Sequence, residues 1–317
     1  MKNIYSNIFP FNKKILLKSI NTLKKGNVVG LPTETVYGLA GNAYSNTSIK
    51  KIYRLKKRPK KNPLIVHYFN FKDAKKDVIF NDNFFKIYKK ICPGPITFIL
   101  KKDPQSKICS SVTNNLDTVA IRFPNHRVIR SILKKINFPL AMPSANLSSG
   151  VSPVSANNVS DEFKKNIKLI IDGGSSKVGL ESTVIDLINK PKILRPGIIV
   201  PKYLTKLLNV RVNVAKKSLK LRSPGMLRRH YSPGIPMILN QKTFKTKNAF
   251  ITFGKSHKDF SNYFNLSRKS NLKEAAFNLY RTLRKIKKLR FKKIYVVKIP
   301  NKGIGIAIND RLKRASY

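Results

Sequence analysis

Two short motifs place cationic and neutral hydrogen-bond donors at spacings that suit phosphate binding. Lys56 and Arg58 occur in the basic segment "LKKRPKKNPL", and Ser144 and Asn146 stand two residues apart in "AMPSANLSSG". Donors from several loops can together surround phosphate oxygens. The sequence has no GxxxxGK[ST] motif, so a phosphate site would be assembled from separate loops. The structural alternatives are a capped turn at Ser144 and one more stretch of basic surface at Lys56.

A third motif offers a site for a carboxylate. Arg122 ends the apolar run "TVAIRF", where a guanidinium can meet a carboxylate through two parallel hydrogen bonds. Residues 30–43, "GLPTETVYGLAGNA", follow a strand pattern and supply two threonine hydroxyls and a carboxylate. Taken alone, this loop is more typical of a turn whose threonines cap backbone donors than of a binding site. Together the motifs favour a crevice that binds a nucleoside triphosphate beside an amino acid.

The chain is strongly basic, but its charge alone does not identify a partner. Lysine and arginine total 65 against 14 acidic residues, which gives a net charge of +51. Such a charge attracts polyanions at long range. Because lysines occur in every segment, compositional drift explains most of this charge, and a single basic run is weak evidence for nucleic-acid binding. Within the basic segment we expect Lys57, Lys60 and Lys61 to face solvent.

Other sequence features point to a cytoplasmic protein without a membrane partner. The two cysteines, Cys92 and Cys109, form no C-x-x-C pair and have no pair of histidines near them, which argues against a zinc site. The first 20 residues lack the apolar core and cleavage site of a signal peptide. No apolar run approaches the roughly 20 residues of a spanning helix.

Alternation of apolar and polar residues predicts a mixed α/β fold that would position these motifs. Helix-like spacing covers residues 13–25, a second helix starts near Asn46 and ends at Pro59, and short apolar runs between further helices are typical of strands. The predicted strands are "NVVGL", "PLIVHYF", "PITFIL", "TVAIRF", "PLAM", "KLIID" and "STVIDL", and the further helices lie near 71–91, 126–136 and 155–166.

We predict two domains joined by a linker. The first covers residues 1–211, the linker covers 212–235, and a small α/β domain covers 236–317. The linker is marked by prolines next to glycine or serine. The last part combines "PMILN", "NAFITFG" and "KIYVVKIP" with an amphipathic helix from Leu272 to Leu289. A unit of this size is at the small end of what folds alone, so we expect it to pack against the first domain.

Ordered sequence blocks along the chain resemble the YrdC-type threonylcarbamoyl-AMP synthases, in the long form with an extra C-terminal domain. The blocks are "PTETVYGLAGNA", "KKRPKKNPLIVH", "PGPITFIL", "VAIRFPNH", "PSANLSSG", "GLESTVIDL", "ILRPG" and "SPGMLRRHYSP", and "GIGIAINDRLKRAS" is similar to the family's ending. The resemblance implies a YrdC-like twisted, mixed, open sheet with flanking helices, followed by a small Rossmann-like β/α domain.

The resemblance also implies an activity. Enzymes of this family make threonylcarbamoyl-adenylate from L-threonine, bicarbonate or CO₂, and ATP, and they release pyrophosphate. A downstream transferase then modifies the adenosine next to the tRNA anticodon. We accordingly expect ATP as a substrate and Mg²⁺ held mainly by phosphates, with no metal ligand from protein side chains. tRNA itself is a further candidate ligand, suggested by charge alone.

By the same resemblance, each matched position receives a role. The family's catalytic K-x-R and S-x-N signature falls on Lys56, Arg58, Ser144 and Asn146. The residues expected to contact ATP are Arg58, Asn62, Thr118, Ser144, Ser152, Arg195 and Tyr231, and those expected around L-threonine are Thr35, His67, Arg122, Met142 and Ser182. The segment "SPGMLRRHYSP" is similar to one that folds over the active site as a lid, although a plain tether between domains is the alternative.

The remaining ionisable residues in these motifs are expected to be structural. Glu34 and Glu181 could orient loops or assist proton removal, and we favour a structural role for both. His126 and His230 are expected to serve packing or the linker rather than catalysis. The sequence shows no Ser-His-Asp or Cys-His arrangement, which fits phosphoryl transfer that depends on positioning and cations.

Two other functions compete with this interpretation. A non-enzymatic RNA-binding or ribosome-maturation module would fit the charge, and it would bind RNA with a steep salt dependence. A carbamoyltransferase of the hydrogenase-maturation type shares this domain, but it normally brings zinc-finger cysteines that this chain lacks. The sequence assigns no nucleotide site to the C-terminal domain.

Overall fold

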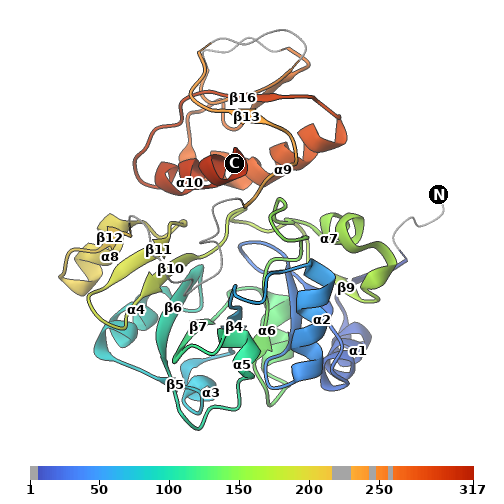
Figure 1. Cartoon of the computed structure of the whole chain (residues 1–317), viewed down its shortest axis with the longest axis vertical. Helices are drawn as coiled ribbons and strands as arrows, with labels where there is room; N and C mark the ends of the chain where they lie inside the picture. Colours follow the sequence, from blue (N-terminus) through green and yellow to red (C-terminus); the bar gives the residue numbers. More distant parts are fainter. Residues whose placement is uncertain (1–5, 216–229, 243–247, 256–259) are drawn as a thin grey trace.

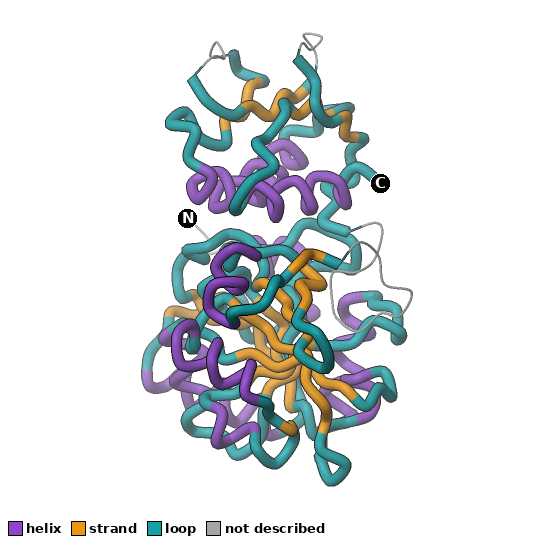
Figure 2. The backbone as a smooth tube through the Cα atoms, turned by 90° about the vertical axis from the view of Figure 1, so that its left-hand side faces the viewer, coloured by secondary structure: helices purple, strands orange, loops and turns teal. Residues whose placement is uncertain are grey.

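The computed structural model describes residues 6–215, 230–242, 248–255 and 260–317, which form a larger and a smaller unit (Figure 1). The larger unit is built on one long mixed sheet, and the smaller on a four-stranded sheet. The helices of the smaller unit lie between its sheet and the larger unit, as both views show (Figure 2). This arrangement confirms the predicted α/β class and the packing of the second unit against the first.

The long sheet brings together strands that are far apart in the sequence. At its centre β4 and β7 are parallel, with His67 opposite Arg122, and β7 runs antiparallel to β6. In spatial order the strands are β1 (Ile8–Pro10), β9 (Ile170–Asp172), β2 (Val29–Leu31), β3 (Gly38–Asn42), β8 (Leu140–Ala141), β4 (Ile65–His67), β7 (Thr118–Arg122), β6 (Ile96–Lys102), β10 (Thr183–Asp186), β11 (Lys192–Arg195) and β12 (Asn213–Val214), while β5 (Val78–Ile79) pairs with β6.

Helices pack their apolar sides against this sheet. In α1 the Asn12 side chain accepts a hydrogen bond from the backbone of Ile15 and caps the helix, which is followed by Gly26 at φ +70°. Residues of α1 and α6 share one apolar cluster, while α2, α4, α7 and α8 contribute to another. The helices are α1 (Lys13–Lys24), α2 (Asn46–Lys56), α3 (Phe71–Ala74), α4 (Asp82–Ile91), α5 (Ser110–Thr113), α6 (Arg127–Leu133), α7 (Ala156–Phe163), η1 (Lys164–Asn166) and α8 (Pro201–Leu208).

The smaller unit has a fully parallel sheet with two helices on one side. The strand order is β13 (Met237–Ile238), β16 (Ile294–Val296), β14 (Ala249–Thr252) and β15 (Tyr263–Asn265), and every pair is parallel. Helices α9 (Leu272–Lys288) and α10 (Gly305–Ala315) bury apolar residues in the core of this unit. A parallel sheet with the α9 crossover between β15 and β16 is similar to a Rossmann-like unit.

Most sequence predictions of elements are confirmed, and one is wrong. Every predicted strand is present, and α1, α2 and α9 match their predicted ranges within a few residues. The single helical stretch near 71–91 is instead α3, β5 and α4, because residues 78–79 pair with β6. Within the predicted linker, residues 213–214 form β12, and residues 216–229 lie outside the described residues.

Candidate active site

A pocket lies where the central strands end, and it collects side chains from motifs distributed along the chain. It encloses about 510 Å³ of empty space, which includes space open to solvent. It is lined by Thr33, Val36, Gly38, Arg58, Ile65, His67, Arg122, Met142, Pro143, Ser144, Glu181, Arg195, His230 and Tyr231.

One side of the pocket presents a buried arginine beside a neutral histidine. Arg122 lies at the end of β7, and its Nη2 donates to Glu34 Oε1 at 2.7 Å. Arg122 Nε and Glu34 Oε2 are buried without a hydrogen-bond partner within the described residues. Burial, followed by the nearby Arg122 charge, lowers the pKa of His67 to about 3. His67 is therefore neutral near pH 7, and Arg122 keeps a donor for a further anion.

The loop after β2 is folded tightly against this side. Thr33 and Thr35 share a hydrogen bond of 2.9 Å between their hydroxyls, and Thr33 also donates to the Val36 carbonyl. Gly38 permits the close approach of Met142, since a Cβ at Gly38 would lie 2.4 Å from Met142 Cγ. A larger residue at Gly38 would push Met142 from its place in the pocket wall.

Two buried cations lie at the C-terminal end of α2. Lys57 adopts a left-handed conformation that ends the helix, with Lys56 as its last residue and Arg58 just beyond it. Lys56 Nζ donates to the Ser144 carbonyl at 2.5 Å and to the Asn146 carbonyl. Arg58 donates to the carbonyls of Asn62 and Pro63 at 3.0 and 2.9 Å. Burial lowers the pKa of Arg58 to about 10, and burial together with Arg58 lowers that of Lys56.

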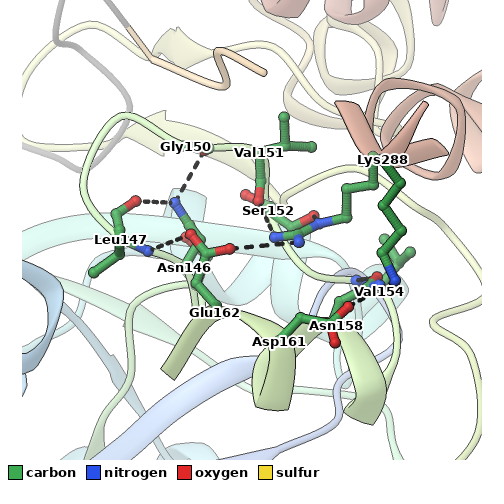
Figure 3. Close-up of polar contacts among 12 residues, drawn as sticks. Asn146, Leu147, Gly150, Val151, Ser152, Val154, Asn158, Asp161, Glu162 and Lys288 are labelled. Atoms are coloured by element: carbon green, nitrogen blue, oxygen red, sulfur yellow. Dashed lines mark hydrogen bonds and ion pairs between the residues drawn. The ribbon is translucent and has the colours of Figure 1, made fainter. Parts of the chain in front are cut away.

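The S-x-N segment is held in one conformation by its own side chains. Ser144 Oγ donates to Asn146 Oδ1 at 2.6 Å. Asn146 Nδ2 donates to the carbonyls of Leu147 and Gly150 (Figure 3). The backbone of Leu147 also donates to Glu162 on α7 at 3.0 Å. Ser144 lines the pocket directly, while Asn146 orients its hydroxyl.

On the opposite side, Arg195 and Tyr231 complete the wall. Arg195 donates to the carbonyl and the hydroxyl of Ser182 at 3.1 and 3.0 Å, and Ser182 Oγ also bonds to Thr97. Tyr231 is fully buried at φ +64°. Its hydroxyl has no hydrogen-bond partner among the described residues. The buried guanidinium and phenol thus give this part of the pocket a polar lining.

Comparisons with known proteins identify the family. A family model described as "Telomere recombination", which covers Sua5, YciO and YrdC proteins, matches residues 21–197. A model of the C-terminal domain of threonylcarbamoyl-AMP synthase matches residues 199–316. The chain belongs to the Sua5/YrdC family.

Relatives match over nearly the whole chain. The threonylcarbamoyl-AMP synthase of Pyrococcus abyssi is 34% identical over 93% of this chain and 92% of its own. That of Bacillus subtilis is 32% identical over 93% of this chain and 90% of its own. A crystal structure of Pyrococcus abyssi Sua5 complexed with L-threonine superposes with a TM-score of 0.88 at 31% identity, covering 98% of this chain and 97% of that one. The chain is thus a two-domain member of the Sua5/YrdC family.

Most residues matched to the family motifs are brought to one place. Arg58, His67, Arg122, Met142, Ser144, Arg195 and Tyr231 line the pocket. Five others do not line the pocket but form hydrogen bonds with residues that do. Lys56 and Asn146 bond to Ser144, Ser152 bonds to Glu181, Ser182 bonds to Arg195, and Thr35 bonds to Thr33.

Two of the expected ATP contacts lie away from the described wall. Thr118 begins β7, four residues before Arg122, on the same face of the strand. Asn62 is buried behind Arg58, and both polar atoms of its side chain lack a hydrogen-bond partner among the described residues. The roles of both residues stay predictions.

Three polar residues that line the pocket had no predicted ligand contact. Glu181 and His230 were expected to be structural, yet both line it, and Thr33 was not singled out. Burial lowers the pKa of His230 to about 3, so it too is neutral near pH 7. The position of His230 next to Tyr231 in one motif is the signal that could have located it.

The described residues contain no group of three histidine, cysteine or acidic side chains placed to hold a metal ion. In the same part of the chain, no helix combines the length and apolar character needed to cross a bilayer.

Proposed function

We propose that this chain synthesises L-threonylcarbamoyladenylate from L-threonine, bicarbonate or CO₂, and ATP, with release of pyrophosphate. The observation that carries the proposal is one pocket that joins the buried guanidiniums of Arg58, Arg122 and Arg195 with neutral donors. Buried cations are stabilised by anionic partners. A triphosphate and an amino-acid carboxylate supply such partners, and the threonine complex of the Pyrococcus abyssi relative supports the assignment.

L-Threonine would bind at Arg122. Its carboxylate would take the donors of Arg122 that Glu34 leaves free, while Thr35, neutral His67, Ser182 and the Met142 backbone would surround the rest. A neutral histidine suits this place because it can accept or donate a hydrogen bond without repelling the ammonium group of threonine. This arrangement favours threonine over an amino acid that lacks the hydroxyl.

ATP would bind at the other side, with its phosphates near Arg58, Ser144 and Arg195. Arg58 now bonds main-chain carbonyls, and phosphate oxygens would stabilise its buried charge. Asn62, Thr118, Ser152 and Tyr231 are the remaining expected contacts. We assign Lys56 the role of fixing the S-x-N segment, because its ammonium group bonds the two carbonyls of that segment.

The reaction needs positioning rather than a protein nucleophile. The deprotonated threonine amine captures CO₂ to give a carbamate. The carbamate oxygen then forms a bond to the α-phosphorus, and the bond from that phosphorus to the bridging oxygen breaks as pyrophosphate leaves. Cations beside the phosphate oxygens would stabilise the charge that develops. Mg²⁺, held mainly by phosphates and water, would add to this charge neutralisation.

The product is a mixed anhydride, so an enzyme that transfers the threonylcarbamoyl group must consume it. We propose a downstream tRNA threonylcarbamoyl transferase as that partner, acting on the adenosine next to the anticodon, and a cytoplasmic location. Direct binding of tRNA is a further proposal that rests on the net charge of +51.

The test is pyrophosphate release by the purified full-length chain. We expect release that requires ATP, L-threonine and bicarbonate together, with a product whose mass is that of the adenylate. Omission of each substrate in turn is the control. Release that does not depend on threonine would refute the proposal. Tight, salt-sensitive RNA binding without any pyrophosphate would instead favour the RNA-binding alternative.

A further inference from the structure

An arginine of the smaller unit reaches the wall of the pocket in the larger one. Arg311 on α10 is fully buried, and its Nε donates to Glu181 Oε2 at 2.9 Å. Its Nη1 donates to Asp310 Oδ2 at 2.7 Å. Glu181 itself lines the pocket. A side chain 130 residues further along the chain therefore contacts a group at the site.

Glu181 forms hydrogen bonds with residues of both units. Its Oε1 accepts from Ser152 Oγ at 2.5 Å, and its Oε2 accepts from the Tyr280 hydroxyl at 2.8 Å as well as from Arg311. Burial opposes ionisation of Glu181, but Arg311, Arg195 and these hydrogen bonds lower its pKa to about 2. The carboxylate is thus charged, and it fixes the orientation of the Ser152 hydroxyl.

The same two helices hold Tyr231. The Arg311 guanidinium lies over the Tyr231 ring, 5.0 Å from its centroid. The ring of Tyr280 stacks on Tyr231 with centroids 5.8 Å apart. Tyr231 adopts a left-handed conformation, which non-glycine residues rarely do without support from their surroundings. Contacts from α9 and α10 supply that support.

We propose that Arg311 and Tyr280 are positioning residues for the nucleotide side of the reaction. Through Glu181 and Tyr231, the second domain orients Ser152 and the phenol ring, so the ATP site is complete only when α9 and α10 are docked. The inference rests on the proposed placement of ATP. The threonine side takes its contacts from the larger unit, since Arg122 pairs with Glu34 and His67 bonds the Ile65 carbonyl.

Further ion pairs join the two units without involving Glu181 or Tyr231. The positioning of these two residues can therefore be tested separately from the stability of the interface. Lys288 on α9 pairs with Asp161 on α7 at 2.8 Å (Figure 3). Arg284 also reaches Glu162, at 3.5 Å. Arg314 on α10 bonds Asp310 at 3.0 Å and shares this carboxylate with Arg311, whereas Lys313 on the same helix is exposed to solvent. Lys313→Ala is therefore the control for a lost cation on the same helix.

The test compares the full-length chain with Arg311→Met, Tyr280→Phe and Lys313→Ala. Initial rates of pyrophosphate release give the KM for ATP at saturating threonine and the KM for threonine at saturating ATP. We expect Arg311→Met to raise the ATP KM at least tenfold and Tyr280→Phe about threefold, with the threonine KM within twofold of wild type. Lys313→Ala should leave both constants unchanged.

Other outcomes would overturn the inference. An ATP KM within twofold of wild type in both Arg311→Met and Tyr280→Phe would do so, as would equal increases of both KM values accompanied by a lower Tm. Should Arg311→Met fail to fold, Tyr280→Phe decides, because it keeps the ring and loses only the hydroxyl. Arg58→Ala separates the two proposals: if it too leaves the ATP KM unchanged, the ATP placement is wrong and this inference fails with it.

Discussion

At the residue scale, the site combines buried cations with hydrogen-bonding capacity that the protein itself does not use. Arg122 Nε, the Tyr231 hydroxyl and the Asn62 amide are buried without partners among the described residues. Such groups cost free energy in a folded protein unless a ligand satisfies them. Because Arg122 and Tyr231 line the pocket, we infer that their unpaired atoms contact a ligand there.

The first prediction concerns Arg122. Arg122→Ala should raise the KM for L-threonine about 10- to 100-fold, because the substrate carboxylate would lose a charged hydrogen bond of about 1.5–3 kcal/mol. Kinetics of pyrophosphate release with threonine varied at saturating ATP measure this effect. The ATP KM is the internal control, since Arg58, Ser144 and Arg195 are unaltered. An unchanged threonine KM would refute the role of Arg122.

The second prediction concerns the charge of His67. With a pKa of about 3, His67 should stay neutral as the pH falls from 8 to 5, with only about 1% protonated at pH 5. Nitrogen chemical shifts of the labelled imidazole, assigned by comparison with His67→Gln, report its protonation directly. Half-protonation near pH 6.5 would contradict the burial argument. Below pH 6.5 the unfolded chain binds this proton more readily, so His67 lowers stability progressively as the pH falls toward 3.

At the element scale, the phosphate side depends on how α2 ends. The left-handed turn at Lys57 places Lys56 under the S-x-N segment and Arg58 in the pocket. The neighbouring Lys57, Lys60 and Lys61 are exposed, as the sequence predicted. Lys56 and Arg58 are thus buried at the site, because the end of the helix directs their side chains inward.

The third prediction removes the contact between α2 and the S-x-N segment. Lys56→Met keeps a similar volume but loses the hydrogen bonds to the carbonyls of Ser144 and Asn146. We expect kcat/KM for ATP to fall about 10- to 100-fold, from the loss of about 1.5–3 kcal/mol of charged hydrogen bonding. Lys57→Met, at an exposed position, is the control and should retain wild-type kinetics. Equal activity of the two variants would show that Lys56 does not fix this segment.

The sequence predicted the elements that carry periodic apolar residues or a clear motif. The helices α1, α2 and α9 have such patterns, and the K-x-R and S-x-N motifs meet at one site. The strands β1, β3, β5, β11, β12 and β15 were missed. All except β3 have two to four residues, which carry too little pattern to be recognised, and the five residues of β3 include two glycines, which are uncommon in strands. The contact of Arg311 with Glu181 was also beyond prediction, since it depends on how two separately encoded units dock.

At the scale of the whole molecule, three carboxylates of the larger unit pair with cations of the smaller one. The chain has only 14 acidic residues. Asp161, Glu162 and Glu181 of the larger unit all pair with cations of α9 or α10. In a chain with a charge of +51, such pairs offset repulsion between two basic units. The interface therefore depends on charge complementarity as well as on apolar packing.

The last prediction tests the buried member of this interface by its pH dependence. The pKa of Glu181 falls from 4.5 to about 2 in the folded chain. A carboxyl whose pKa is depressed contributes stability that is fully present above its unfolded pKa. That contribution, up to about 3 kcal/mol, is lost as the pH falls through the folded value.

Above pH 5, Glu181→Gln should thus unfold at lower urea concentration than wild type, and this difference should shrink between pH 4.5 and 2. Asp161→Asn, which removes the carboxylate of the more exposed pair, should cost less than about 1 kcal/mol. A difference between Glu181→Gln and wild type that does not change with pH would mean that the buried carboxylate is not ionised at the junction of the two units.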